Sequence, residues 1–161
     1  MNLRSLFSEL SGSLPIERIM FLVDFSTLPQ SIREETRLNF EEVRKCYYAG
    51  AFRSATGMCG RILEVLLARK YFEERGVDPI EQQWKMGLLM RKCFENNVLD
   101  EPALGDICNL INRSRINSVH STRRLYRPEQ DDTKPIIEFT IGLVKKLFQP
   151  TTWQARASNC L

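Results

Sequence analysis

The sequence predicts an all-α fold, an antiparallel helical bundle of four to five main helices preceded by short N-terminal helices. Apolar residues recur every three to four positions along most of the chain, which is the period of an amphipathic helix. No stretch shows the alternation of apolar and polar residues that is typical of a half-buried strand. Glycines and prolines fall between the periodic stretches and divide the chain into segments of helix length.

The composition is that of a soluble globular protein. Hydrophobic residues make up 43% and charged residues 27% of the 161 positions, and the net charge of +3 does not by itself indicate nucleic-acid binding. The 5 cysteines include no close pair, which argues against a disulfide framework and favours a reducing compartment. The longest apolar run, residues 19–23, is far shorter than a membrane span of about 20 residues. We therefore expect a cytoplasmic protein without a membrane anchor.

The chain divides into a helical N-terminal extension over residues 1–28, a helical bundle over 29–149 and a polar tail over 150–161. The bundle begins with Ser31-Ile32-Arg33-Glu34, a capping-box pattern that predicts the start of a long helix. This helix ends before Gly50, and we expect one side of it to be buried. The apolar residues of that side are Leu38, Phe40, Val43 and Tyr47.

A second long helix is predicted from Ala51 to Arg75, with Gly76 as its terminator. The link to the first helix is short, so the two should be antiparallel. Gly57 and Gly60 each weaken the helix by roughly 1 kcal/mol relative to alanine, which is reasonable where another helix passes close by.

Two further helices follow. Asp78-Pro79-Ile80-Glu81 combines an N-cap, a proline at the first helical position and a reciprocal glutamate, and predicts a helix that ends at Asn96-Asn97. Asp100 and Pro102 open the next helix, whose apolar stripe leads into residues 112–120. That stripe consists of Leu104, Ile107, Cys108 and Ile111.

A last helix is predicted to start at Thr133-Lys134-Pro135, after an acidic turn at residues 129–132, and to stop at Pro150. Its apolar residues recur in helical register. In the tail that follows, Trp153 is the one large apolar side chain that would anchor it.

His120 is the only histidine, and histidine has the side-chain pKa nearest to neutral pH, so it is the first candidate for acid/base chemistry. On a helix, Arg113, Asn117 and His120 project along one stripe. The long side chain of Arg115 can swing toward the same space, so that guanidinium, amide and imidazole form a phosphate site. The alternative is structural: His120 caps the helix and the arginines complement its dipole.

Basic residues concentrate around this histidine without an interrupting acid. The arginines of the stretch are Arg113, Arg115, Arg123, Arg124 and Arg127. Such a run can follow a phosphate backbone while Tyr126 stacks on a base. The alternative is an ordinary solvated loop.

The Arg-x4-His pattern of Arg115 and His120, late in a central helix, resembles the motif of the HEPN superfamily. The stretch from Tyr48 to Ala55, followed by Arg61-Ile62-Leu63-Glu64, looks like the second-helix signature of a prokaryotic HEPN-like family classed as a domain of unknown function. The resemblance covers about residues 32–148.

This resemblance implies a metal-independent ribonuclease site at a two-fold dimer interface, in a protein that acts as a toxin or phage-defence effector. Arg115 matches the motif arginine and His120 the motif histidine. It also implies RNA, a second copy of the chain and a cognate antitoxin or defence-system protein as partners. Elementary chemistry agrees with a dimer, because one histidine does not readily serve as base and acid at once, whereas a symmetric pair does.

The first hypothesis is therefore an RNA endonuclease in which His120 transfers the proton, Arg115 contacts the phosphate and Asn117 orients either group. The remaining residues would dock the substrate: Arg113, Arg123, Arg124, Tyr126 and Arg127. No cofactor or metal is expected, since one histidine and no carboxylate cluster at ligand spacing offer no metal site.

The second hypothesis is a non-catalytic module that binds RNA, a nucleotide or a protein. Ile116 stands where the family often has a polar residue, and Arg115 would then pair with Glu64 across helices, while Arg61 and Glu64 form an intrahelical pair. A third reading, a hydrolase using a cysteine with His120, is weaker because nothing marks a cysteine as activated.

Overall fold

The computed structural model describes residues 15–16, 18, 23–120 and 125–148, and within them the chain is all-α with no strand. The predicted helical bundle is confirmed. Its elements are a short 3-10 helix and five α-helices: η1 (Phe25–Thr27), α3 (Gln30–Tyr48), α4 (Phe52–Arg75), α5 (Met86–Glu95), α6 (Pro102–Val119) and α7 (Gln130–Phe148). The predictions for residues 1–14, for Arg123 and Arg124, and for Trp153 lie outside the described residues.

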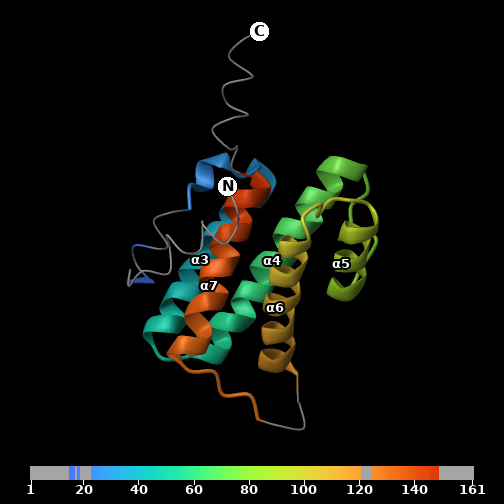
Figure 1. The fold of residues 1–161 in the computed structure, drawn as a ribbon. Helices are drawn as coiled ribbons and strands as arrows, with labels where there is room; N and C mark the ends of the chain where they lie inside the picture. The colour runs from blue at the N-terminus through green and yellow to red at the C-terminus, as the bar shows by residue number, and fades with distance from the viewer. Residues whose placement is uncertain (1–14, 17, 19–22, 121–124, 149–161) are drawn as a thin grey trace.

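Helix α4 is the centre of the bundle, and α3, α6 and α7 all pack against it (Figure 1). A tight turn at Gly50, with φ of 72°, joins α3 to α4 and makes them antiparallel as predicted. Helix α5 lies at the outer edge, next to α4 and α6. Among the described residues, no helix combines the length and apolar character that crossing a bilayer requires.

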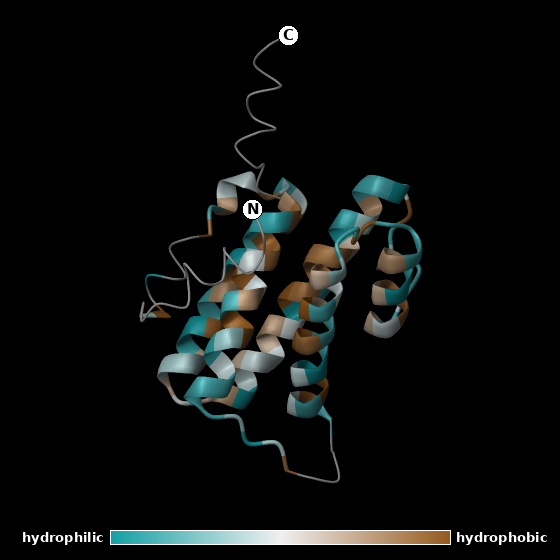
Figure 2. Cartoon of the chain, in the orientation of Figure 1, coloured by the Kyte–Doolittle hydropathy of each residue, from teal (hydrophilic) through white to brown (hydrophobic). Residues whose placement is uncertain are grey.

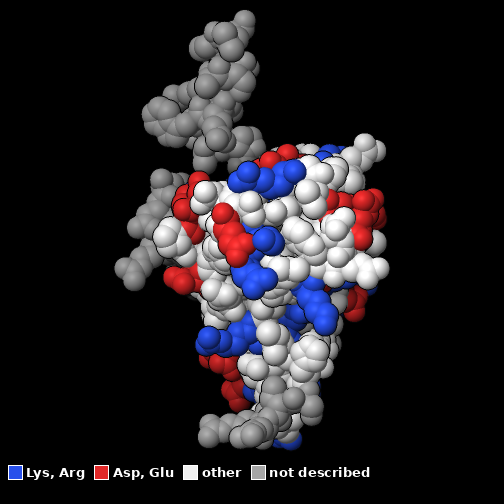
Figure 3. All heavy atoms as spheres, turned by 90° about the vertical axis from the view of Figure 1, so that its right-hand side faces the viewer, with Lys and Arg blue, Asp and Glu red and all other residues white. Residues whose placement is uncertain are grey.

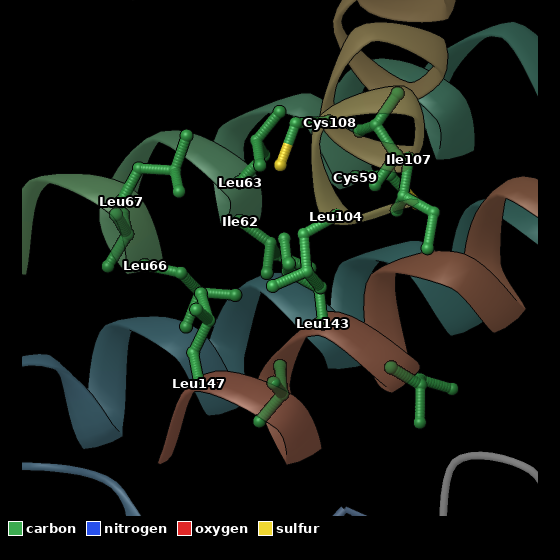
Figure 4. Close-up of a cluster of buried hydrophobic side chains, with 14 of the residues drawn as sticks. Cys59, Ile62, Leu63, Leu66, Leu67, Leu104, Ile107, Cys108, Leu143 and Leu147 are labelled. Atoms are coloured by element: carbon green, nitrogen blue, oxygen red, sulfur yellow. The ribbon is translucent and has the colours of Figure 1, made fainter. Parts of the chain in front are cut away.

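The hydrophobic core surrounds α4, and a large part of it lies where α4 faces α6 and α7. Hydrophobic segments turn inward and hydrophilic segments outward along these helices (Figure 2). Figure 4 shows the buried cluster, to which the three helices contribute Cys59, Ile62, Leu63, Leu66, Leu67, Leu104, Ile107, Cys108, Leu143 and Leu147. Burying one such leucine or isoleucine contributes roughly 1.5–3 kcal/mol, so this cluster fixes α6 on α4.

Helix α3 starts earlier than predicted, at Gln30 with Pro29 as its N-cap residue, and the expected capping box does not form. The carbonyl of Pro29 accepts backbone hydrogen bonds from Ile32 and Arg33, which places Ser31 inside the first turn. Leu38 is also 50% exposed rather than buried. It lies between the buried positions Thr36 and Phe40, where a helix points outward.

The pattern Asp78-Pro79-Ile80-Glu81 forms a turn and not the predicted helix start. Asp78 caps it locally, with Oδ1 accepting a 2.8 Å hydrogen bond from the Ile80 amide. Gln83 then takes a φ of 53°, which ends any helical continuation, and α5 begins only at Met86. Helix α5 ends before Asn96-Asn97, as predicted.

Helix α7 starts at Gln130, before the predicted Thr133, because the acidic residues form its first turn. Asp132 Oδ2 accepts a 2.9 Å hydrogen bond from the amide of Glu129. The Thr133 hydroxyl donates to the Glu129 carbonyl at 2.8 Å. Pro135 consequently lies inside the helix rather than at its start.

Candidate functional site

The site is built where the first half of α4 crosses the last half of α6. Two glycines of α4 lie at this crossing. A Cβ atom on Gly57 would lie 3.8 Å from Val119 Cγ1, and one on Gly60 would lie 2.4 Å from Arg115 Cβ. Only a residue without a side chain fits at Gly60, so the close approach predicted from the two glycines is confirmed at Gly60, whereas Gly57 has room for a methyl group.

Ser118, near the end of α6, is held by the first turns of α4. Its carbonyl accepts a 2.6 Å hydrogen bond from Arg53 Nε. Its hydroxyl lies 2.7 Å from Thr56 Oγ1 and donates to the Ser114 carbonyl at 2.7 Å. Carbonyls in the last turn of a helix have no partner within the helix, so these contacts fix the end of α6.

His120 is the C-cap residue of α6 and is exposed to solvent. Its amide still donates to the Ile116 carbonyl at 3.0 Å, but its φ of −105° and ψ of 148° are those of extended backbone. The helical projection predicted that His120 continues the stripe of Arg113 and Asn117. The extended backbone at His120 shows that it does not. It lies just beyond the turn that Ser118 anchors.

Arg115 lies against α4, with the stem of its side chain over Gly60 and the side chain 28% exposed. Arg115 Nη2 is 4.0 Å from Glu64 Oε2, which places the predicted supporting residue Glu64 beside it. Arg61 Nη1 is 3.9 Å from the same oxygen.

Arg61 also reaches across to α3, with its Nη2 2.8 Å from Glu35 Oε1. The predicted intrahelical pair of Arg61 and Glu64 is therefore the looser contact of this arginine. Together these pairs form a chain of alternating charges from α3 over α4 to α6, and Arg115 is its last described member. Glu64 is shared by two arginines.

Basic side chains gather across the middle of the face seen in Figure 3, on the α5 side of the bundle, with acidic ones mostly above and around them. Of the predicted RNA-binding residues, Arg113 and Arg127 are exposed and Tyr126 is half-buried. Asn117 is half-buried, two residues before the end of α6. These positions leave each of the four side chains with access to solvent.

Apolar side chains are also exposed around the end of α6. Ile116 is 40% and Val119 57% exposed, and residues three apart lie on one side of a helix. Leu125, beyond the helix, is 65% exposed. Large exposed apolar side chains that gather at one place are typical of a surface that another molecule covers. The candidate catalytic residues thus lie next to two exposed apolar side chains of α6, Ile116 and Val119.

The cysteines of the core are poor nucleophiles. Burial raises the pKa of the thiols of Cys59, Cys93 and Cys108 to about 12, so they stay protonated at neutral pH. Cys46 is half-buried, and burial raises its pKa as well. A cysteine hydrolase has no support among these residues. In the described part of the chain, no three His, Cys, Asp or Glu side chains are grouped to hold a metal ion.

Sequence reasoning missed Arg53, Thr56 and Ser118 as supports of the site. The available signal was the small residues at four-residue spacing on both helices, Thr56 with Gly60 and Ser114 with Ser118. Such spacing places them on one face of each helix, where two backbones can approach closely.

In comparisons with family models, curated proteins and solved structures, nothing matches this chain. Function is therefore inferred from the residues of the site and their geometry.

Proposed function

We propose that the chain is a metal-independent RNA endonuclease of the HEPN type that works as a homodimer. The observation that carries this proposal is the imidazole of the exposed residue His120, held at a fixed helix end within one and a half turns of Arg115. An imidazole can move protons near neutral pH, and a guanidinium binds phosphate oxygens at any working pH.

Cleavage of RNA without a metal requires a base for the 2′-hydroxyl, an acid for the leaving oxygen and a cation for the crowded phosphate. Each chain supplies one imidazole. The exposed side chains of Ile116 and Val119 would bring a second copy of the chain to the end of α6, and with it a second His120. Arg115 and Asn117 then contact and orient the phosphate from both sides.

The decisive experiment incubates the purified protein with single-stranded RNA in EDTA. Wild type cleaves and His120→Ala does not, whereas Arg44→Ala, an exposed change on α3, cleaves as wild type does. His120 is exposed, so its replacement leaves the melting temperature unchanged and separates lost chemistry from lost folding. Intact RNA with wild type, or equal cleavage by the His120 variant, would refute the nuclease.

The dimer is tested by sedimentation. Val119→Asp replaces one of these apolar side chains with a charged one and should convert a dimer to a monomer, while Leu38→Asp on α3 should not. A wild-type monomer at micromolar concentration would contradict this part of the proposal.

The proposed role as toxin or phage-defence effector predicts that expression of the protein arrests growth and that His120→Ala relieves the arrest.

A second candidate is a non-catalytic module that binds RNA, a nucleotide or a protein. The observation that favours it is Arg115 itself, because its stem packs on Gly60 and its guanidinium faces Glu64, as a structural arginine does. In that case the RNA stays intact in EDTA and binding survives the loss of His120.

A further inference from the structure

A groove of about 460 Å³ lies beside the candidate site, between the start of α3, the outer face of α4 and the turn over residues 78–84. Glu64 and Arg61 line one part of it. Since Glu64 is also 4.0 Å from Arg115 Nη2, the groove opens next to the motif arginine. Its volume is in the range that holds small organic ligands.

The groove has an apolar and aromatic side. Phe72 is 40% and Ile80 71% exposed, and both line it together with Trp84. The ring of Trp84 packs edge-on against the buried Tyr71, with centroids 5.2 Å apart, which holds the indole in place. A fixed aromatic wall of this kind suits a flat ring.

The polar side of the groove carries both signs of charge. Glu35, Glu64 and Asp78 place carboxylates along it, Arg61 and Arg69 line it too, and Arg61 pairs with Glu35 and Glu64. Carboxylates accept hydrogen bonds well from the amino groups of nucleobases. The aromatic wall and the carboxylates therefore suit the base of a nucleotide.

We propose that this groove binds an unpaired base of the RNA strand whose phosphate is held at Arg115. The inference rests on the proposed function, and adds to it that the substrate is single-stranded and that Trp84 contacts a base. A base in a duplex is stacked and paired, so it cannot enter the groove. Aromatic stacking tolerates any base, and the carboxylates favour bases that carry an amino group.

The test uses Trp84 as its own reporter. The chain has 2 tryptophans, so Trp153→Phe leaves Trp84 as the only one. This variant is titrated with a single-stranded hexanucleotide that carries 2′-O-methyl groups and cannot be cleaved. We expect saturable quenching of Trp84 fluorescence by the single strand and none by the same sequence as a duplex.

Ile80→Ser in the same background should weaken binding about fivefold, and Leu110→Ser, an exposed change on α6 outside the groove, should leave it unchanged. Ile80 is too exposed for its loss to unfold the protein. Binding seen by anisotropy of a labelled strand without any change at Trp84, equal quenching by the duplex, or no binding at all would overturn the inference. Because the strand is uncleavable, this result is independent of whether wild type cuts RNA in EDTA.

Discussion

Arg53 Nε donates a 2.6 Å hydrogen bond to the backbone carbonyl of Ser118, although the two residues are 65 positions apart in the chain. Arg53 belongs to the first turn of α4, and Ser118 lies two residues before His120. The start of one helix therefore holds the end of another, at the point where the only histidine leaves it.

Replacement of Arg53 by alanine should loosen this helix end. We expect a loss of about 1 kcal/mol in the free energy of unfolding, because a partly buried carbonyl loses a charged donor. Hydrogen exchange of the amides in the last turn of α6 should speed up, and RNA cleavage should fall with it. The exposed Arg44→Ala change on α3 is the control. Unchanged exchange in α6 would show that Arg53 does not hold Ser118.

Alanine at the two glycines of the crossing should act in opposite directions. At Gly60 the new Cβ would lie 2.4–2.5 Å from Arg115 Cβ, Cγ and Cδ, so we expect a loss of roughly 1–3 kcal/mol. At Gly57 the nearest atoms are 3.8–3.9 Å away, an ordinary contact, and better helix propensity should add about 0.5–1 kcal/mol. Urea denaturation measures both. Equal effects at the two positions would refute the close approach of α6 at Gly60.

The contact between Arg115 and Glu64 should be weak. Its atoms are 4.0 Å apart and the two side chains are 28% and 30% exposed, so solvent screens the pair. A double-mutant cycle with Arg115→Met, which keeps the stem over Gly60, and Glu64→Gln should give a coupling of about 0.2–1 kcal/mol that falls as salt is added. A coupling several times larger and independent of salt would make the pair structural and favour the non-catalytic module.

Glu138 should make the protein less stable as the pH rises. Burial raises the pKa of this carboxyl above its ordinary 4.5, and Lys134, with Nζ 3.9 Å from Oε1, offsets only part of that effect. The folded state then binds the proton more tightly than the unfolded state. Stability therefore falls as the pH rises from 4.5 through the raised value.

Glu138→Gln removes the buried charge and should raise the melting temperature at pH 7. The gain should shrink toward pH 4, where the wild-type carboxyl is protonated in both states. Thermal unfolding at a series of pH values measures it. A gain that does not change with pH would show that Glu138 is not titrating in this way.

The helices whose signals are local were predicted well. Helix α4 runs to Arg75 because its apolar residues keep one period, and Gly76 ends it with a φ of 68°. The prediction that a helix starts at Asp78 was wrong. The same side-chain cap serves a helix or a turn, and the backbone at Gln83 decides between them. Likewise, the carboxylates before Thr133 fit either an acidic turn or a first helical turn.

Of the candidate site, the sequence alone indicated His120, Arg115, Glu64 and the close passage at the glycines. It did not indicate that His120 leaves the helix as extended backbone, since helical projection assumes that the helix continues. The contact of Arg53 with Ser118 joins two elements far apart in the chain. No local pattern encodes such a pairing, which arises only when α6 packs on α4.

Glu64 stands between two guanidinium groups, 3.9 Å from Arg61 and 4.0 Å from Arg115. In the proposed nuclease, an incoming phosphate oxygen would take the place of Glu64 beside Arg115 by anion exchange. Both arginines keep their charge throughout, so this exchange releases no proton, and Arg61 remains as a counterion to the displaced carboxylate. Phosphate capture at Arg115 would then respond to ionic strength.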